Sequence, residues 1–288
     1  MKIEDIKSIG VAGAGTMGRG ISICSSAAGY KTILYDINQE TLNKAKELIE
    51  KDLSKSVEKK KLTEEKKIKT LNNINFTSEF SDLKDSDFII EAALEDMKLK
   101  KEIFSELDLI CKSDAVLSTN TSSLSVTTIS TFVKKNPGRV VGLHFFNPAN
   151  IMKLVEVVKG DFTSQEVVEL SAELSKRLGK VTVTAKDTPA FIVNRIARPF
   201  YGEALKILSE GTAEVETIDK VMKSCGGFAM GPFELMDLIG IDVNFSVTKS
   251  VYESFFNDPK YRPNFIQKKM VDSNLMGRKT KRGFYNYE

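Results

Sequence analysis

A glycine-rich turn between two apolar segments constrains the fold more than any other feature of this chain. Residues 6–12 have the composition of a short buried strand, and they run directly into Gly13-Ala14-Gly15-Thr16-Met17-Gly18. A stretch of small residues through Ala28 favours a helix, and a second apolar segment, 31–36, follows it and ends on Asp36. A strand, a G-x-G-x-x-G turn, a helix and a strand ending on an acid are typical of a βαβ unit that binds a dinucleotide.

Each part of this unit has a physical role in dinucleotide binding. Gly13 permits a tight turn, Gly15 lets the backbone approach a pyrophosphate, and Gly18 lets the helix pack close to the strand. The start of the helix supplies unpaired N–H groups and a positive dipole end for phosphates. Asp36 lies 18 residues after Gly18, where an acid can accept hydrogen bonds from the adenosine ribose.

Composition limits the class of protein and the compartment. The 288 residues suffice for one large or two ordinary domains. The net charge of +3 is too balanced to indicate a nucleic-acid partner. The three cysteines, Cys24, Cys111 and Cys225, form no C-x-x-C pair, so we expect neither disulfides nor a metal site. With no signal-peptide core and no run of 18 apolar residues, we expect a cytoplasmic protein without a membrane segment.

Apolar segments alternate with helical patterns as far as about residue 186, which indicates βαβ units and a mainly parallel sheet. The expected strands are 6–12, 31–36, 87–92, 115–119, 139–145, 153–159 and 181–185. The expected helices are 16–28, 39–61, 64–71, 97–111 and 164–178. Helices 39–61 and 64–71 are expected to form an excursion from the sheet. The fold class is therefore α/β, with a Rossmann-type sheet in residues 1–186.

The pattern changes after residue 186. Apolar residues recur with helical spacing between Phe191 and Leu208, and Gly211 follows as a plausible end of that helix. Gly231-Pro232 is suited to open another helix. No convincing strand precedes the C-terminal tail, so we expect residues 187–288 to form a second, all-helical domain.

His144 is the only histidine, and it ends an apolar strand, where a parallel sheet forms its ligand crevice. It is either a structural histidine or a general base. Glu156 lies 12 residues later among valines, and a carboxylate is expensive to bury there without a partner. Held against His144, it would fix the tautomer and stabilise the imidazolium. On an exposed strand face it would do neither, and strand alternation leaves both arrangements open.

Three other groups of polar residues each allow two interpretations. The small residues 118–123 either turn the chain and cap the next helix or line the crevice with donors. Asn194 is either a core amide or a crevice residue. Lys55 and Lys59 share a helix face and either grip a phosphate or are simply solvated.

Specific strings of residues run through nearly the whole chain. They are Gly13-Ala14-Gly15-Thr16-Met17-Gly18, Ile89-Ile90-Glu91-Ala92-Ala93, Asn120-Thr121-Ser122-Ser123-Leu124, His144-Phe145-Phe146-Asn147-Pro148-Ala149, Met152-Lys153-Leu154-Val155-Glu156-Val157, Phe191-Ile192-Val193-Asn194-Arg195, Met230-Gly231-Pro232-Phe233-Glu234-Leu235-Met236-Asp237 and Gly283-Phe284-Tyr285. Together they resemble the short-chain L-3-hydroxyacyl-CoA dehydrogenase family, and most of all its bacterial 3-hydroxybutyryl-CoA members.

The resemblance implies a catalytic set in which Ser122 and Asn194 bind the substrate oxygen beside a His144–Glu156 pair. It implies an NAD site formed by Gly13, Ala14, Gly15, Thr16, Met17, Gly18, Asp36, Glu95, Lys100, Asn120, Ser122, Asn147 and Lys279. It places Lys55, Lys59 and Ser122 at the coenzyme A substrate. It further implies a homodimer formed through residues 187–288, which also serve the substrate.

Two positions depart from the family pattern. Asp52 stands where the family has a serine near the coenzyme A phosphates, which an acid would repel. Ala190 replaces a glycine, and an alanine disfavours positive φ, so we expect the hinge between the two domains to differ slightly.

The expected activity is NAD-dependent interconversion of short 3-hydroxyacyl-CoA and 3-ketoacyl-CoA thioesters, with hydride transfer at C3. Two alternatives keep the fold. One is a dehydrogenase of a free β-hydroxy acid, and the other is a non-catalytic NAD-binding family member. The presence of Ser122, His144, Glu156 and Asn194 argues against the second.

Overall fold

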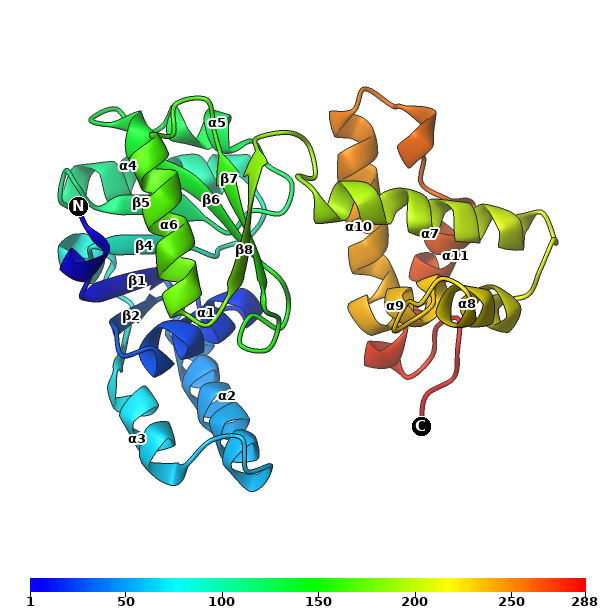
Figure 1. Cartoon of the computed structure of the whole chain (residues 1–288), viewed down its shortest axis with the longest axis horizontal. Coiled ribbons are helices and arrows are strands. Elements are labelled where there is room, and N and C mark those ends of the chain that lie inside the picture. The colour runs from blue at the N-terminus through cyan, green and yellow to red at the C-terminus, as the bar shows by residue number, and fades with distance from the viewer. The chain divides into compact units, whose positions relative to one another are not determined.

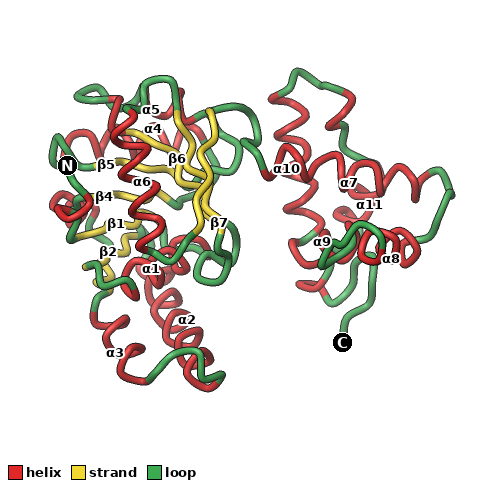
Figure 2. The backbone as a smooth tube through the Cα atoms, viewed as in Figure 1, coloured by secondary structure: helices red, strands yellow, loops and turns green.

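The computed structural model describes residues 1–288 and divides into two compact units, Met1–Thr188 and Pro189–Glu288. The first unit is built on one eight-stranded sheet with the order β3-β2-β1-β4-β5-β6-β7-β8 (Figures 1 and 2). The strands are β1 Ser8–Ala12, β2 Lys31–Tyr35, β3 Ile74–Thr77, β4 Phe88–Glu91, β5 Val116–Thr119, β6 Val140–Phe145, β7 Leu154–Lys159 and β8 Val181–Lys186.

The sheet is parallel from β3 to β6, whereas β7 pairs with β6 antiparallel and β8 runs parallel to β7. The chain moves outward from β1 through β2 to β3 and then returns to add β4 on the other side of β1. This reversal creates a switch point between β1 and β4, where open α/β sheets bind ligands beyond the strand ends. The predicted α/β class with a Rossmann-type sheet is confirmed.

Helices cover both faces of this sheet, with α1 and α6 on one face and α4 and α5 on the other (Figure 1). Their bounds are α1 Thr16–Ala27, α2 Gln39–Glu58, α3 Glu64–Asn72, α4 Met97–Ile110, α5 Val126–Ser130 and α6 Gln165–Arg177. Each helix from α2 to α6 begins after a side chain that accepts a backbone N–H of the first turn, which satisfies one of its unpaired donors. These caps are Asn38, Thr63, Asp96, Ser125 and Ser164.

The sequence pattern missed β3, which is a short strand at the edge of the sheet. Its four residues pair with β2 alone, and only Ile74 and Thr77 are buried. So short and half-buried a segment has too little alternation to be recognised. Helices α2 and α3 lie next to it and project beyond the sheet, as expected (Figure 1).

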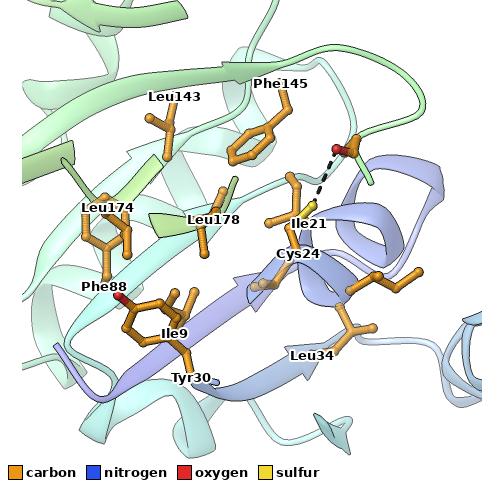
Figure 3. Packing of buried hydrophobic residues seen from close by; sticks show 14 of the residues in the cluster. Ile9, Ile21, Cys24, Tyr30, Leu34, Phe88, Leu143, Phe145, Leu174 and Leu178 are labelled. Atoms are coloured by element: carbon orange, nitrogen blue, oxygen red, sulfur yellow. Dashed lines mark hydrogen bonds between the residues drawn. The ribbon is translucent and has the colours of Figure 1, made fainter. Parts of the chain in front are cut away.

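One large apolar cluster fixes the strands under α1 and α6 (Figure 3). Alternate strand residues such as Ile9, Phe88 and Leu143 enter it from the sheet, and Ile21 and Leu174 enter it from the helices. All five are fully buried. Close packing of these buried side chains holds the strand ends in register, and so fixes the positions of the residues that follow them.

The second unit is all-helical, with α7 Val193–Ser209, α8 Val215–Ser224, α9 Pro232–Ile239, α10 Ile241–Ser254 and α11 Phe265–Asp272. Gly211 follows α7 with φ 69°, and α9 begins at Pro232, both as predicted. The only β-type pairings are isolated bridges within residues 277–286. None of the helices in either unit combines the length and the apolar composition needed to cross a membrane.

Ala190 differs from the expectation that an alanine avoids positive φ, because its φ is 65° and that of Phe191 is 49°. Ala190 is 1% exposed and packs in an apolar cluster with Val251 and Tyr261. Packing therefore holds this residue in a left-handed conformation that its Cβ disfavours by roughly 1 kcal/mol.

Candidate active site

Most of the residues that the sequence singled out in the first unit gather at one edge of the sheet. Strands β1, β2, β4, β5 and β6 run parallel, so their carboxyl ends lie at the same edge. The residues that follow these five ends are the turn 13–18, Asp36, Glu95, the segment 120–123 and Asn147.

The glycine-rich turn is closed at two glycines and open at the third. A Cβ on Gly13 would lie 2.7 Å from the Ala92 carbonyl oxygen, and one on Gly18 would lie 1.7 Å from that of Gly13. A Cβ on Gly15 would have no atom within 4 Å. Gly15 is also the N-cap of α1, so open space lies in front of the unpaired amides of that helix. The turn thus fits a dinucleotide pyrophosphate.

Asp36 adjoins this turn. Its Oδ2 accepts a hydrogen bond from the Ala14 amide at 2.8 Å, and its Oδ1 accepts one from the Asn38 amide at 3.0 Å. Each carboxylate oxygen accepts more than one hydrogen bond, so the half-buried side chain can still receive ribose hydroxyls.

His144 and Glu156 are direct cross-strand partners on β6 and β7. The His144 Nδ1 lies 2.7 Å from Glu156 Oε2, and the two residues are 5% and 0% exposed. The antiparallel pairing of β7 explains this contact, because directly opposed residues project to the same face of a sheet. A buried carboxylate at Nδ1 fixes the hydrogen there and places the basic lone pair on Nε2. The pair has the chemistry of a general acid–base.

The turn after β5 is held by its neighbours on both sides. Asn120 Oδ1 accepts the Phe145 amide at 2.9 Å and ties the end of β5 to the residue after His144. Glu95 Oε1 accepts from the Ser122 amide at 2.8 Å and from its hydroxyl at 3.1 Å. Ser122 is therefore fixed beside the strand that carries His144.

Glu95 stays ionised in this setting. Burial raises the pKa of Glu95, but the Lys100 charge and hydrogen bonds from Thr121 and Ser122 outweigh burial, and the pKa lies below its ordinary value. The side chain is 36% exposed, and its Oε2 lies 3.6 Å from Lys100 Nζ.

Lys100 itself is 1% exposed, and its Nζ lies 2.8 Å from both carboxylate oxygens of Glu91. Glu91 was not among the predicted site residues, although an acid in an otherwise apolar buried strand is a signal of a paired charge.

The remaining predicted residues lie elsewhere. Lys55, in the last turn of α2, and Lys59, its C-cap, are both exposed, as is Asp52 on the same helix. Asn194 is half-buried in the first turn of α7. Lys279 is exposed and forms an ion pair with Asp242. Asn194 and Lys279 belong to the second unit.

Comparison with known proteins assigns both units to one family. Residues 8–188 match the model of the 3-hydroxyacyl-CoA dehydrogenase NAD binding domain, and residues 191–287 match that of the 3-hydroxyacyl-CoA dehydrogenase C-terminal domain.

Individual relatives cover nearly the whole chain. A 3-hydroxybutyryl-CoA dehydrogenase of Clostridioides difficile is 44% identical over 97% of this chain and 99% of its own. A 3-hydroxyadipyl-CoA dehydrogenase of Escherichia coli is 44% identical over 98% of this chain, which spans 59% of that longer protein.

A solved structure shows the same arrangement of elements. The (S)-3-hydroxybutyryl-CoA dehydrogenase of Ralstonia eutropha superposes with a TM-score of 0.93 at 38% identity, covering 99% of this chain and 100% of that one. With both family models matched in order over almost all residues, the chain belongs to the 3-hydroxyacyl-CoA dehydrogenase family, and its first unit is that family's NAD-binding domain.

Proposed function

We propose that this NAD-dependent dehydrogenase interconverts 3-hydroxybutyryl-CoA and acetoacetyl-CoA. The observation that carries the proposal is the buried His144–Glu156 pair. Its histidine lies on β6, the strand next to β5, and β5 leads into the polar turn that holds Ser122. Full-length similarity to 3-hydroxybutyryl-CoA dehydrogenases supports the acyl group.

His144 is the general acid–base of the proposed reaction. In the oxidative direction its Nε2 takes the proton of the 3-hydroxyl, and Glu156 stabilises the imidazolium that forms. In the reductive direction the imidazolium returns that proton to the oxygen. Bound NAD supplies the hydride acceptor or donor for C3. Ser122 and Asn194 donate hydrogen bonds to the substrate oxygen and stabilise the charge that develops on it.

Other residues of the chain bind the cofactor and the substrate. The turn 13–18 and Asp36 hold NAD, together with Glu95, Lys100, Asn120, Ser122, Asn147 and Lys279. Lys55 and Lys59 bind the phosphates of coenzyme A. Residues 187–288 form the substrate domain and the interface of a homodimer. The protein works in the cytoplasm.

Initial rates with a series of 3-ketoacyl-CoA thioesters test the acyl group. Acetoacetyl-CoA, longer straight-chain thioesters and 3-ketoadipyl-CoA are compared with NADH and with NADPH. We expect the highest kcat/KM for acetoacetyl-CoA with NADH. A higher kcat/KM for 3-ketoadipyl-CoA or for the longer thioesters would contradict the proposed substrate.

Asp36 should exclude NADPH. Its carboxylate accepts a hydrogen bond from the ribose 2′-hydroxyl of NADH, whereas it repels the 2′-phosphate that NADPH carries at that position. NADPH should therefore bind at least tenfold more weakly than NADH, a difference of about 1.4 kcal/mol or more. Calorimetry of both cofactors with the wild type and with Asp36→Asn measures this. Asp36→Asn keeps the size of the side chain, and it should bring the Kd for NADPH closer to the Kd for NADH. Equal binding of the two cofactors by the wild type would refute the role of Asp36.

Lys55 and Lys59 should affect substrate affinity alone. They lie on the excursion formed by α2 and α3, and contacts far from the reacting carbon act equally in ground and transition states. Lys55→Ala with Lys59→Ala should raise KM for acetoacetyl-CoA several-fold and leave KM for NADH unchanged. Because solvated phosphate contacts are screened, added salt should weaken acyl-CoA binding more in the wild type than in the variant. An unchanged KM at two ionic strengths would identify these lysines as a solvated surface.

A further inference from the structure

A buried ion pair lies behind the turn that carries Ser122. Glu91 ends β4 and is 0% exposed, and its two oxygens each lie 2.8 Å from the Nζ of Lys100 on α4. Thr119 at the end of β5 donates its hydroxyl to Glu91 Oε2 at 2.7 Å, and the Ala93 amide donates to Oε1 at 2.7 Å. Every oxygen of this carboxylate is therefore satisfied inside the protein.

Stability alone is a weak reason for such a pair. Desolvating two charges costs several kcal/mol, and apolar side chains of similar volume often stabilise a buried site as well or better. Glu91 follows three fully buried apolar residues, Phe88, Ile89 and Ile90. An ion pair in this position needs another physical explanation, and its next neighbour supplies one.

Lys100 connects the pair to the candidate active site. Its Nζ lies 3.6 Å from Glu95 Oε2. The other Glu95 oxygen accepts from the Thr121 hydroxyl at 2.7 Å, the Ser122 amide at 2.8 Å and the Ser123 amide at 3.1 Å. A continuous series of polar contacts thus runs from Thr119 and Glu91 through Lys100 and Glu95 to Ser122.

The geometry of this series gives each member a distinct part. A lysine ammonium is a compact charge on a flexible stem, so its position depends on the groups that bind it. Glu91, itself fixed by Thr119, supplies that anchor. Lys100 then lies between two carboxylates and attracts one oxygen of Glu95, while the turn 121–123 donates hydrogen bonds to the other Glu95 oxygen.

We propose that Glu91 and Thr119 are positioning residues, which hold the Lys100 ammonium behind Glu95 and through Glu95 hold Ser122 for the reaction. Neither side chain touches the substrate. This inference rests on the role proposed for Ser122, and its consequence is that both residues affect turnover and NADH affinity without binding either ligand.

Three variants of strand β5 separate positioning from mere stability. Thr119→Val removes the hydroxyl with little change in shape, and Thr119→Ser retains it. Ser118→Ala is the matched control, because Ser118 is also 0% exposed and its hydroxyl donates to the Ile89 carbonyl at 2.8 Å, outside the series. The melting temperature, the Kd for NADH and the kcat and KM for acetoacetyl-CoA are measured for each.

We expect Thr119→Val to lower kcat about tenfold and weaken NADH binding several-fold, with KM for acetoacetyl-CoA nearly unchanged, because a displaced catalytic group slows reaction steeply. Thr119→Ser should restore both values. Ser118→Ala should lower only the melting temperature. Wild-type kcat and Kd in Thr119→Val, or equal losses in Thr119→Val and Ser118→Ala, would overturn the inference.

A single variant tests Glu91 directly. Glu91→Gln removes the charge that anchors the Lys100 ammonium and keeps the shape of the side chain. Lys100 stays in place, because it is itself among the residues proposed to hold NAD. The control is Asp108→Asn on α4, which removes the charge of another buried ion pair, formed at 2.8 Å with Arg139 just before β6. Thermal melting checks that both variants fold. Glu91→Gln should weaken NADH binding, and Asp108→Asn should not. Equal NADH affinity in the two variants would overturn the inference. Failure of the wild type to reduce acetoacetyl-CoA would instead refute the proposed function, and it would leave this comparison of NADH affinities unaffected.

Discussion

Replacement of His144 should lower kcat with acetoacetyl-CoA by roughly two to four decades, the usual effect of losing a general acid–base. His144→Ala also removes the hydrogen bond between His144 Nδ1 and the buried Glu156 carboxylate, and loss of one member of a buried pair destabilises a protein by about 3–5 kcal/mol. His144→Asn avoids this loss, because its amide N–H keeps a donor near the position of Nδ1 while the basic Nε2 is gone. Both variants should therefore be nearly inactive, and His144→Asn should be the more stable.

Glu156→Gln completes this test. It keeps the shape of the side chain and removes the charge that stabilises the imidazolium, so kcat should fall while the Kd for NADH stays near that of the wild type. Steady-state rates, thermal melting and NADH calorimetry on the three variants measure these effects. A folded His144→Asn protein that binds NADH and turns over at the wild-type rate would show that another group transfers the proton.

Gly18→Ala should nearly abolish NADH binding. A Cβ on Gly18 would lie 1.7 Å from the Gly13 carbonyl oxygen, whereas such atoms pack at about 3.5 Å, so the turn has to move by more than 1 Å. We expect Kd for NADH to rise about 100-fold, equivalent to about 2.7 kcal/mol, and the melting temperature to fall.

Gly15→Ala separates ligand approach from folding. Gly15 has φ −67° and ψ −166°, which an alanine adopts without strain, and a Cβ there would meet no atom within 4 Å. It should leave the melting temperature unchanged and raise Kd for NADH about tenfold, because the methyl group enters the space proposed for the pyrophosphate. Gly202→Ala in α7 is the control, since it also meets no atom and should leave NADH binding unchanged. Wild-type affinity in both Gly15→Ala and Gly18→Ala would exclude this turn as the phosphate site.

The sequence predicted most of the sheet because most of its strands are short apolar runs flanked by glycines and polar turns. Six of the strands lie within the expected segments, and β8 extends one residue beyond its own. Strand β3 is absent from them because its pattern is too short. The antiparallel direction of β7 was beyond prediction. Direction depends on how the chain returns to the sheet, which local composition does not record.

In the candidate site, too, features set by neighbouring residues were predictable and contacts between distant segments were not. The glycine turn was recognisable because its glycines are required by contacts within a short stretch of the chain. The sequence left open whether Glu156 faces His144, since that contact depends on the register of β6 and β7. No sequence pattern indicated that Lys100 contacts Glu91 and Glu95 in the interior, and its place at the cofactor stays a prediction. Only the pairing of β4 with β5 brings Thr119 to that ion pair.

The proposed activity is tested most directly by NADH oxidation with acetoacetyl-CoA and with free acetoacetate, using the wild type and His144→Asn at equal concentrations. The account predicts rapid turnover of the thioester by the wild type, a far lower kcat/KM for the free acid, and almost no turnover by His144→Asn despite normal NADH binding. A folded wild-type protein that binds NADH but leaves acetoacetyl-CoA unreduced, or that prefers free acetoacetate, would contradict it.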